Sequence, residues 1–457
     1  MEEDWTAIVL AAGLGKRMRS KKPKALHSLA GRPMVLHVLT AVRGAFDSAE
    51  RPARYIVVVG HGAAQVTAVL DDSVQTVQQA EQLGTGHAVA QAMPVAKDSG
   101  HVLVINADVP LIWSRTIEDL MTRHLAAKAD LTFLTAIVDD PRGQGRVQHD
   151  ESGRVTGIIE EADADATTLA GNEVNAGVYC FRAEWLRPCL ARIERSAAGE
   201  YYLTDLVGMG VDEKAKIVAM PVGDAAEALG INDRVQLAQA EGVLRERIRR
   251  RHMLAGVTIV DLATTYIDAD VTIGKDTTLY PNTCLGGRAT VGEECIIGPG
   301  SQVIDSTLGA RCHVDSSVVE QSTLEDDVDV GPFSHLRAGA YVCSGAHIGN
   351  FAEVKNSRIG RNSKMGHFSY VGDAQVGDEV NIGAGTITCN FDGVSKHRTV
   401  IGDGAFIGSD TMLVAPVEVG AGAQTAAGSV VNHDVPPNML AVGAPARLRR
   451  RKERNID

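Results

Sequence analysis

The chain has 457 residues, enough for two or three domains, and 44% of them are hydrophobic, a proportion typical of proteins that bury large cores. Its 45 basic and 57 acidic residues give a formal net charge of −12, which argues against a protein that coats nucleic acid or an anionic membrane. The seven cysteines are odd in number and show no CxxC spacing, so neither a disulfide framework nor a cysteine-rich zinc site is expected. The N-terminal residues lack a basic n-region, and no apolar run reaches about 18 residues, so we expect a cytoplasmic protein without a membrane span.

Residues 1–231 show the alternation of strands and helices that is typical of a parallel sheet wrapped by helices. Apolar, β-rich runs predict strands, and helix-like stretches lie between them: strands at 6–12, 55–59 and 102–105, and helices at 33–45, 62–71 and 84–97. In such sheets ligands bind beyond the carboxyl ends of the strands. The glycine loop after the first strand and Asp108 after the third are therefore candidate site elements.

The glycine loop reads Gly13-Leu14-Gly15 and matches neither the GxGxxG nor the Walker pattern, so alone it indicates only a tight turn. Arg17 and Lys24 follow within a dozen residues, and two cations beside exposed backbone N–H groups suit a triphosphate. A strand-end aspartate such as Asp108 is often an N-cap or turn residue, but it is also a common carboxylate ligand for Mg²⁺.

Six motifs in this half, taken in order, resemble those of the sugar-nucleotide pyrophosphorylases. They are Leu10–Met18 with Pro23-Lys24, Gln79–His87, Asp108–Leu111, Gly145-Arg146, Glu160 and Asn175–Gly177. The resemblance implies an α/β Rossmann-like nucleotidyltransferase domain that moves UMP from UTP to a sugar 1-phosphate. It implies that Arg17 and Lys24 carry phosphate charge in catalysis and that Asp108 and Asn232 hold Mg²⁺. The residues implied to bind UTP and the UDP-sugar are Leu10, Ala11, Ala12, Gly13, Lys24, Gln79, Gly84, Thr85, Gly145, Glu160, Asn175 and Asn232.

A linker helix is expected over 232–252, because Leu237, Leu244 and Ile248 fall on one helical face. We interpret the arginines near its end as a solvated helix C-terminus rather than a nucleic-acid site. Asn232 stands where an N-cap is expected, and the residues alone favour capping. The resemblance favours a metal contact instead.

From residue 268 the sequence repeats every six residues, with aliphatic side chains at Ile273, Leu279, Leu285, Val291 and Ile297. Hexapeptide spacing is typical of a parallel β-helix, in which each short strand points one aliphatic inward and glycine relieves strain at the corners. We expect about ten coils within 253–457, with loops or irregular coils at 305–327, 336–347 and 388–400. The flat, β-branched faces favour a cyclic trimer with sites between subunits.

Four histidines lie in the middle of the repeat, at positions 313, 335, 347 and 367. A zinc site of the kind found in hexapeptide-repeat carbonic anhydrases is one alternative. Arg337, Lys355 and Lys396 lie in the same region, and these cations suit a phosphorylated substrate rather than CO₂.

Segments 349–355, 366–372 and 381–390 resemble the acetyltransferase half of the bacterial bifunctional N-acetylglucosamine-1-phosphate uridyltransferase/glucosamine-1-phosphate acetyltransferases. With the first-half motifs, this resemblance covers nearly the whole chain. It implies a left-handed parallel β-helix, acetylation of glucosamine 1-phosphate by acetyl-CoA, and then formation of UDP-N-acetylglucosamine for cell-envelope synthesis. The implied enzyme is a homotrimer that acts on small molecules, with no nucleic-acid or membrane partner.

For this second half the resemblance implies His367 as the general base. The implied glucosamine-phosphate site is formed by Arg337, Lys355, Tyr370, Asn381 and Lys396. The implied acetyl-CoA site is formed by Ala384, Asn390, Phe391, Ser409, Ala427 and Arg447, the last of which opens a basic tail. The chain departs from the family pattern at Asn106-Ala107 (Tyr-Gly), Phe391 (Tyr) and Asp261-Leu262 (Asp-Pro).

Two alternatives use the same two modules. The first is a single-activity sugar-1-phosphate nucleotidyltransferase with a structural or regulatory β-helix. The second is a non-enzymatic assembly subunit. His367, Lys355 and Lys396 in register argue against the first, and the retained Arg17, Lys24 and Asp108 argue against the second.

Overall fold

The computed structural model describes residues 4–450, and its contacts divide the chain into two compact units, 1–244 and 245–457. No helix in the described part of the chain is long and apolar enough to cross a membrane.

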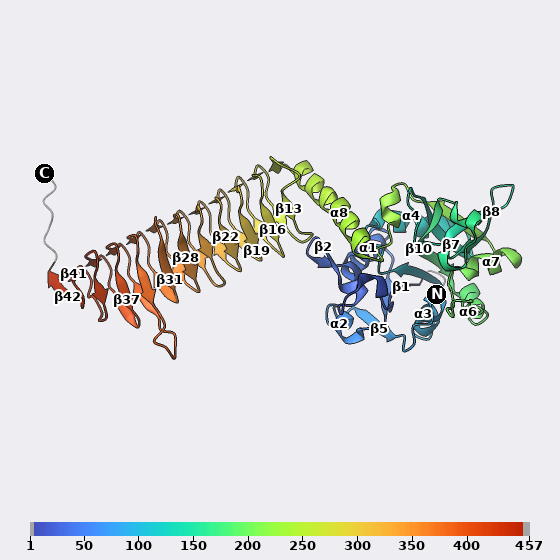
Figure 1. The fold of residues 1–457 in the computed structure, drawn as a ribbon, viewed down its shortest axis with the longest axis horizontal. Coiled ribbons are helices and arrows are strands. Elements are labelled where there is room, and N and C mark those ends of the chain that lie inside the picture. Colours follow the sequence, from blue (N-terminus) through green and yellow to red (C-terminus); the bar gives the residue numbers. More distant parts are fainter. Residues whose placement is uncertain (1–3, 451–457) are drawn as a thin grey trace. The chain divides into compact units, whose positions relative to one another are not determined.

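The first unit is built on a mixed sheet with the strand order β11-β7-β10-β6-β1-β4-β5, and β8 and β9 extend from β10 (Figure 1). Its strands are β1 (Trp5–Ala11), β4 (Ala53–Val59), β5 (Val74–Gln78), β6 (His101–Asn106), β7 (Leu131–Ile137), β8 (Arg146–His149), β9 (Val155–Ile159), β10 (Glu173–Arg182) and β11 (Ile217–Pro221). The three predicted strands are confirmed, and β1 pairs in parallel with both β4 and β6. A small hairpin of β2 (Ser28–Leu29) and β3 (Arg32–Pro33) precedes the first long helix.

The sheet is not fully parallel, because β10 runs antiparallel to both β6 and β7. The chain first crosses to the carboxyl edge of the sheet through the β8–β9 hairpin, so β10 starts at that edge and runs back. This direction brings Asn175, near the start of β10, to the edge where β1 and β6 end.

Helices cover both faces of this sheet, because alternate residues of β1 are buried on opposite sides. Trp5, Ala7 and Val9 pack with the α1 and α4 side, whereas Ile8 packs with the α3, α6 and α7 side. The helical segments are η1 (Lys16–Met18), η2 (Lys24–Leu26), α1 (Met34–Ser48), α2 (Ala63–Thr67), α3 (Thr85–Ala92), α4 (Ser114–Ala127), η3 (Glu161–Asp163), α5 (Ala166–Leu169), α6 (Ala183–Leu190), α7 (Asp205–Asp212) and η4 (Ala225–Ala228).

The predicted linker helix is α8, which spans Arg234–Leu254. Its first half packs on the first unit, where Ala240 is fully buried in a small cluster with Leu29, Met34 and Leu111. The last residues of α8 belong to the second unit, in which Arg245 Nη1 donates to Ile267 O at 3.2 Å.

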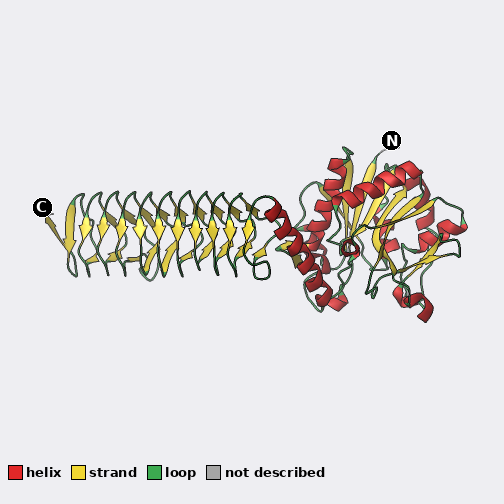
Figure 2. Ribbon diagram, turned by 90° about the horizontal axis from the view of Figure 1, so that it is seen from above, coloured by secondary structure: helices red, strands yellow, loops and turns green. Residues whose placement is uncertain are grey.

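The second unit is a β-helix of three sheets, which we name faces 1, 2 and 3 (Figure 2). Face 1 holds β12 (Thr258–Ile259), β15 (Thr278–Leu279), β18 (Ile296–Ile297), β21 (His313–Val314), β24 (Asp329–Val330), β27 (His347–Ile348), β30 (Lys364–Met365), β33 (Asn381–Ile382), β36 (Phe406–Ile407), β39 (Gln424–Thr425), β41 (Met439–Val442) and β42 (Arg447–Arg450). Face 2 holds β13 (Tyr266–Ile267), β16 (Cys284–Gly286), β19 (Gln302–Ile304), β22 (Val318–Glu320), β25 (His335–Leu336), β28 (Ala352–Lys355), β31 (Ser369–Gly372), β34 (Ile387–Cys389), β37 (Met412–Val414) and β40 (Val430–Val431). Face 3 holds β14 (Thr272–Ile273), β17 (Thr290–Val291), β20 (Thr307–Leu308), β23 (Thr323–Leu324), β26 (Tyr341–Val342), β29 (Arg358–Ile359), β32 (Ala374–Val376), β35 (Thr399–Ile401) and β38 (Val417–Val419).

The hexapeptide period explains these three faces, because successive aliphatics of the repeat lie on successive strands. Leu279 is on face 1, Leu285 on face 2 and Val291 on face 3, and all three point into the core with at most 2% exposure. Ile297 then returns to face 1 and pairs directly with Leu279. Three hexads therefore close one coil.

The expected irregularities take two forms. At 305–327 and 336–347 the coils continue without a loop, and only their corners change length. Gln302 pairs with Val318, 16 residues later, whereas His335 pairs with Glu353, 18 residues later. At 388–400 the chain does leave the helix in a loop, so that Asn381 pairs with Phe406, 25 residues later.

Candidate active sites

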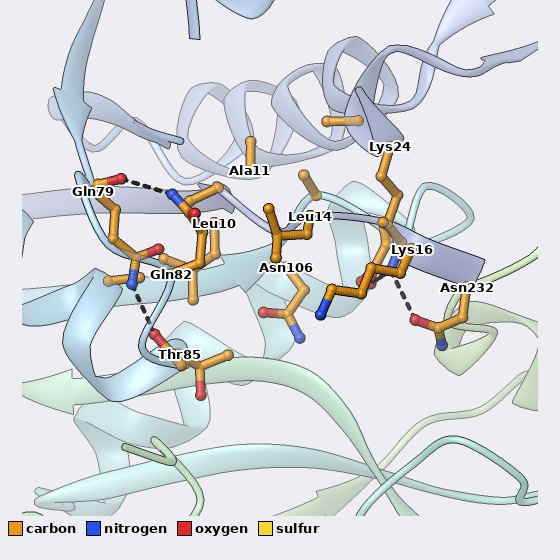
Figure 3. Close-up of a pocket in the computed structure, with 18 of the residues that line it drawn as sticks. Leu10, Ala11, Leu14, Lys16, Lys24, Gln79, Gln82, Thr85, Asn106 and Asn232 are labelled. Carbon is orange, nitrogen blue, oxygen red and sulfur yellow. Dashed lines mark hydrogen bonds and ion pairs between the residues drawn. The ribbon is translucent and has the colours of Figure 1, made fainter. Parts of the chain in front are cut away.

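A cavity of about 390 Å³ opens at the carboxyl ends of β1 and β6 (Figure 3). The structure brings together here almost all of the residues predicted to bind nucleotide and metal. The lining residues that were predicted are Leu10, Ala11, Ala12, Gly13, Arg17, Lys24, Gln79, Gly84, Thr85, Asp108 and Asn232. A volume of this size is typical of small-molecule sites.

Glycine is required at position 15 of the loop for two reasons. Its φ of +60° lies in the left-handed region, and a Cβ built there would come within 2.8 Å of the Lys24 Cβ. The bare backbone of Gly15 therefore allows the stem of Lys24 to pass beside the loop.

Lys24 joins the two predicted metal ligands. Its Nζ donates to Asp108 Oδ2 at 2.5 Å and to Asn232 Oδ1 at 2.8 Å, and Figure 3 shows the contact with Asn232. The side chains of Lys24 and Asp108 are only 16% and 24% exposed. A carboxylate oxygen and an amide oxygen thus converge on one position that holds a positive charge, and these are oxygen ligands of the kind that Mg²⁺ takes. The residues present fit a divalent metal.

The N-terminus of α8 decides between the two interpretations of Asn232. Asp233 Oδ1 accepts hydrogen bonds from the backbone N–H groups of Val235 and Gln236, both at 2.9 Å. Asp233 is therefore the N-cap, and the capping role that the residues alone favoured for Asn232 is wrong. Ile231 N donates to Asp108 O at 2.9 Å, which fixes the segment before Asn232 beside Asp108.

Gln79 is held in one orientation at the nucleotide end of the cavity. The side chain is 3% exposed, and its Nε2 donates to Gly84 O at 3.0 Å and lies 3.0 Å from His87 Nδ1. Because a carbonyl oxygen only accepts, the amide nitrogen must face Gly84. Gln79 Oε1 is therefore the atom left to accept a hydrogen bond from a ligand.

A second, smaller cavity adjoins the first, and Gly145, Glu160 and Asn175 line it as predicted. Glu160 accepts a hydrogen bond from Thr204 Oγ1 at 2.8 Å, and burial raises the pKa of its carboxyl although this bond opposes the shift. Asn175 Nδ2 donates to Tyr179 Oη at 2.5 Å. The cavity is therefore lined by hydrogen-bonding groups fixed by their neighbours, which suits a sugar.

Several lining residues were missed from the sequence. Asn106, noted only as a departure from the family pattern, lines both cavities. Tyr179 lies four residues after Asn175 on β10, a same-face spacing that gave a usable signal. Thr204 lies in a segment without a recognisable pattern and gave none. Arg146, from the matched Gly145-Arg146 motif, is 2% exposed and donates through Nε to Gly171 O at 3.0 Å, so it supports the fold instead of lining either cavity.

In the β-helix, Lys355 and Lys396 lie side by side, although 41 positions separate them in the sequence. The neighbouring Lys396 ammonium lowers the pKa of Lys355, and the Arg337 charge adds to this effect. Two ammonium groups this close repel each other unless an anion lies between them. The geometry predicts an anion site at the end of β28.

The polar groups around these lysines form one network on face 2. Arg337 Nη1 donates to Glu353 Oε1 at 2.7 Å, and Glu353 pairs in register with Tyr370. Asn390 Nδ2 lies 3.4 Å from Tyr370 Oη and 2.5 Å from Asp373 Oδ2. Asn390, predicted at the acetyl-CoA site, is thus also tied to the predicted sugar site.

Phe391 is 59% exposed and forms an isolated bridge with Lys396, which closes the loop that carries this lysine.

Other predicted residues lie elsewhere on the second unit. Asn381 is on face 1, between Lys364 and Phe406, and not in the network on face 2. His367 is exposed at the corner between β30 and β31. Within this one chain, the predicted sugar residues are therefore divided between two faces on either side of the His367 corner.

The predicted acetyl-CoA residues follow that corner along the β-helix. Gly385 N donates to Phe368 O at 2.7 Å, Asp410 N to Ala384 O at 2.7 Å, and Gly428 N to Ser409 O at 2.8 Å. Ala384, Ser409 and Ala427 therefore stack at successive coils, starting next to His367. Arg447 is exposed at the start of β42, which pairs antiparallel with β41; residues 451–454 of the predicted basic tail lie outside the described residues.

The four histidines do not form a zinc site within the chain. Asp329 binds both His313 and His347 on face 1, at 2.8 and 2.6 Å, whereas His335 lies on face 2 and contacts Glu320 at 3.1 Å. No group of three or more metal-binding side chains of the His, Cys, Asp or Glu type occurs between residues 4 and 450.

The fold and the two sites define a class of protein, a nucleotidyltransferase joined to a hexapeptide-repeat transferase. The family model described as the MobA-like NTP transferase domain matches residues 7–200, and that described as the bacterial transferase hexapeptide (six repeats) matches residues 270–305 and 398–433.

Curated relatives extend the match over the full chain. The bifunctional protein GlmU of Heliobacterium modesticaldum is 48% identical over 439 residues, 96% of this chain and 95% of the relative. That of Caldanaerobacter subterraneus subsp. tengcongensis is 46% identical over 441 residues, again 96% and 95%. That of Geobacillus sp. (strain WCH70) is 46% identical over 453 residues, 99% and 97%.

The chain belongs to the family of GlmU bifunctional proteins. The expected fold is confirmed, a nucleotidyltransferase unit followed by a left-handed β-helix of hexapeptide repeats. The expected pair of activities is confirmed as well, uridyltransferase and glucosamine-1-phosphate acetyltransferase, in the synthesis of UDP-N-acetylglucosamine for peptidoglycan.

Proposed function

We propose that the cavity of the first unit transfers UMP from UTP to N-acetylglucosamine 1-phosphate, with Mg²⁺ held by Asp108 and Asn232. The observation that supports this assignment is the convergence of these two oxygen ligands on one cation position, 2.5 and 2.8 Å from Lys24 Nζ. When bound, the metal neutralises phosphate charge as pyrophosphate leaves.

The chain's own residues supply position and charge for this transfer. The sugar phosphate oxygen attacks the α-phosphorus in line, a P–O bond forms, and the bond to pyrophosphate breaks. Arg17 and Lys24 border the cavity at the glycine loop and carry the phosphate charge. Because little covalent chemistry is needed, correct placement of the two substrates provides most of the rate.

The bases and sugars are selected by groups with fixed orientation. Gln79 Oε1 accepts the N3–H of uracil, which cytosine lacks, while Gln79 Nε2 stays on Gly84 O. Gly145, Glu160 and Asn175 bind N-acetylglucosamine 1-phosphate in the smaller cavity. The loop 10–13 and Gly84-Thr85 border the uridine.

The second unit transfers acetyl from acetyl-CoA to the amine of glucosamine 1-phosphate. His367 takes a proton from the amine as its nitrogen attacks the thioester carbon, the C–S bond breaks, and CoA leaves as the thiol after protonation. Arg337, Lys355 and Lys396 hold the sugar phosphate, and Tyr370 and Asn381 orient the sugar. Ala384, Asn390, Phe391, Ser409, Ala427 and Arg447 line the path of acetyl-CoA, and the stack of small residues beside His367 supports this direction.

We further propose a homotrimer. Phe333 and Phe351 stack on each other at 5.3 Å between ring centroids, and both are 59% exposed, at corners of successive coils. Exposed aromatic side chains in such a row are typical of an interface. A neighbouring subunit at this edge brings a second copy of face 1 toward face 2, which joins the divided sugar residues into one site.

The functional boundaries follow the chemistry, with the uridyltransferase in 1–231, the linker helix in 232–252 and the acetyltransferase in 253–457. Location in the cytoplasm, where UTP and acetyl-CoA are made, is supported by the seven cysteines, which are free thiols.

Two variants and two assays test these assignments on the full-length enzyme. CoA release is followed with glucosamine 1-phosphate and acetyl-CoA, and pyrophosphate release with N-acetylglucosamine 1-phosphate, UTP and Mg²⁺. His367→Ala should abolish CoA release and leave pyrophosphate release intact, and Asp108→Ala should do the reverse. Loss of both activities in either variant would contradict two independent sites, and retained activity in both assays would contradict the residue roles.

A further inference from the structure

Lys24 faces two demands that a single conformation does not meet. Its ammonium is bonded to Asp108 and Asn232, at 2.5 and 2.8 Å, and so occupies the position assigned above to the metal. The proposed reaction needs the same ammonium on the phosphates of UTP. Figure 3 shows Lys24 reaching across the cavity from η2 to Asn232.

We propose that Lys24 is an exchangeable cation, which occupies the metal position in the free enzyme and moves to the triphosphate when nucleotide and metal bind. The inference rests on the proposed function, because it assumes that Asp108 and Asn232 are the metal ligands. It adds that metal binding depends on where Lys24 lies.

Electrostatics favours this exchange. The Asp108 carboxylate is mostly buried, and without a cation it would be a poorly solvated negative charge beside Asn232 Oδ1. Lys24 compensates this charge and holds the two ligands together. A divalent ion at the same oxygens would lie within hydrogen-bond distance of the ammonium, where like charges repel strongly, so both cations do not fit at once.

Nucleotide removes the conflict, because a triphosphate above loop 13–17 offers the ammonium new anionic partners. Lysine suits the move, since its charge sits on a flexible four-carbon stem. The stem passes Gly15, where a side chain would block it. Metal and nucleotide therefore bind cooperatively, and by linkage each raises the affinity for the other by the same factor.

The test is Mn²⁺ binding to the full-length enzyme without nucleotide, measured by electron paramagnetic resonance of the free ion. Lys24→Met removes the exchangeable cation and should bind Mn²⁺ at least about tenfold more tightly than the unmodified enzyme, since breaking charge-assisted hydrogen bonds weakens binding by this order. Lys16→Met is the matched control, because Lys16 lines the same cavity and is exposed but has no side-chain bond to Asp108 or Asn232 among the described contacts. It should change Mn²⁺ affinity by less than about threefold.

Equal Mn²⁺ affinity in the unmodified enzyme and Lys24→Met overturns the proposal, and so does an equal gain in Lys16→Met, which would indicate only the loss of general repulsion. Lys24→Gln serves as the second neutral variant if Lys24→Met does not fold, and CoA release by the second unit together with thermal melting reports folding. A double variant, Lys24→Met with Asp108→Ala, separates the two levels. If it binds Mn²⁺ as tightly as Lys24→Met alone, the ion lies elsewhere and the proposed metal site fails, independently of the exchange.

Discussion

A buried histidine makes the first unit sensitive to acid. His124 is fully buried, with Nδ1 2.9 Å from Thr132 Oγ1 and Nε2 3.1 Å from His101 Nδ1. Burial, assisted by the neighbouring His101, lowers the pKa of His124 from 6.5 to about 3. The folded state therefore stays neutral at a pH where the unfolded state takes up a proton.

The sign and size of the effect follow from linkage. Because the folded pKa lies below the unfolded value, stability is complete above pH 6.5 and is lost as the pH falls toward 3. At pH 5 the unfolded His124 lies about 1.5 pH units below its pKa, and at about 1.4 kcal/mol per unit the loss is about 2 kcal/mol. His124→Gln keeps a neutral hydrogen-bonding side chain and should remove this part of the pH dependence.

Tryptophan fluorescence isolates the first unit, because all three tryptophans, Trp5, Trp113 and Trp185, belong to it, and Trp5 lies 6.0 Å from the His124 ring. Urea unfolding at pH 7.5 and pH 5.0 gives the change in unfolding free energy. The difference between the two pH values should be about 2 kcal/mol larger in the unmodified enzyme than in His124→Gln. His61→Gln, at an exposed position, is the control and should behave as the unmodified enzyme. An identical pH dependence in His124→Gln and the unmodified enzyme would refute the reasoning.

Three further predictions concern the two sites. Gly15→Ala forces a Cβ against Lys24, so pyrophosphate release should fall at least about tenfold while CoA release is unchanged, and steady-state assays of both reactions check this. Gln79→Glu brings a carboxylate against Gly84 O, so kcat/KM for UTP should fall by about two orders of magnitude, and unchanged preference for UTP over CTP would contradict the assigned orientation. Lys396→Met removes one of two paired ammoniums, so KM for glucosamine 1-phosphate should rise at least about tenfold with little change in KM for acetyl-CoA, and a pH titration of Lys355 should show its pKa rising.

The repeat was the most predictable part of the fold because its period fixes geometry directly. One aliphatic every six residues assigns Leu279, Leu285 and Val291 to three successive faces, and the structure places each of them there. The exceptions arise at corners. A corner that gains or loses a residue breaks the sequence period but not the strand pairing, so 305–327 looked irregular and is not.

The candidate sites were predictable where a motif supplies the residues and less so where distant segments meet. Loop 10–17 and Asp108 follow strands that end at one edge, so their convergence was expected. The cap of α8 depended on which of two neighbours, Asn232 or Asp233, turns its side chain toward the helix, and composition does not decide this. Lys24 between the metal ligands was not foreseen, because that contact depends on the conformation of a long side chain.

The loop after Asn390 has a consequence for how such a protein changes over time. Each coil is bonded only to the coils before and after it, and pairing resumes in register between Asn381 and Phe406 as soon as the loop ends. An insertion at a corner therefore costs the ladder nothing beyond closure of the loop, which grows slowly with length. Evolution can thus add a lysine-bearing arm to a finished scaffold in one step, without redesigning its core.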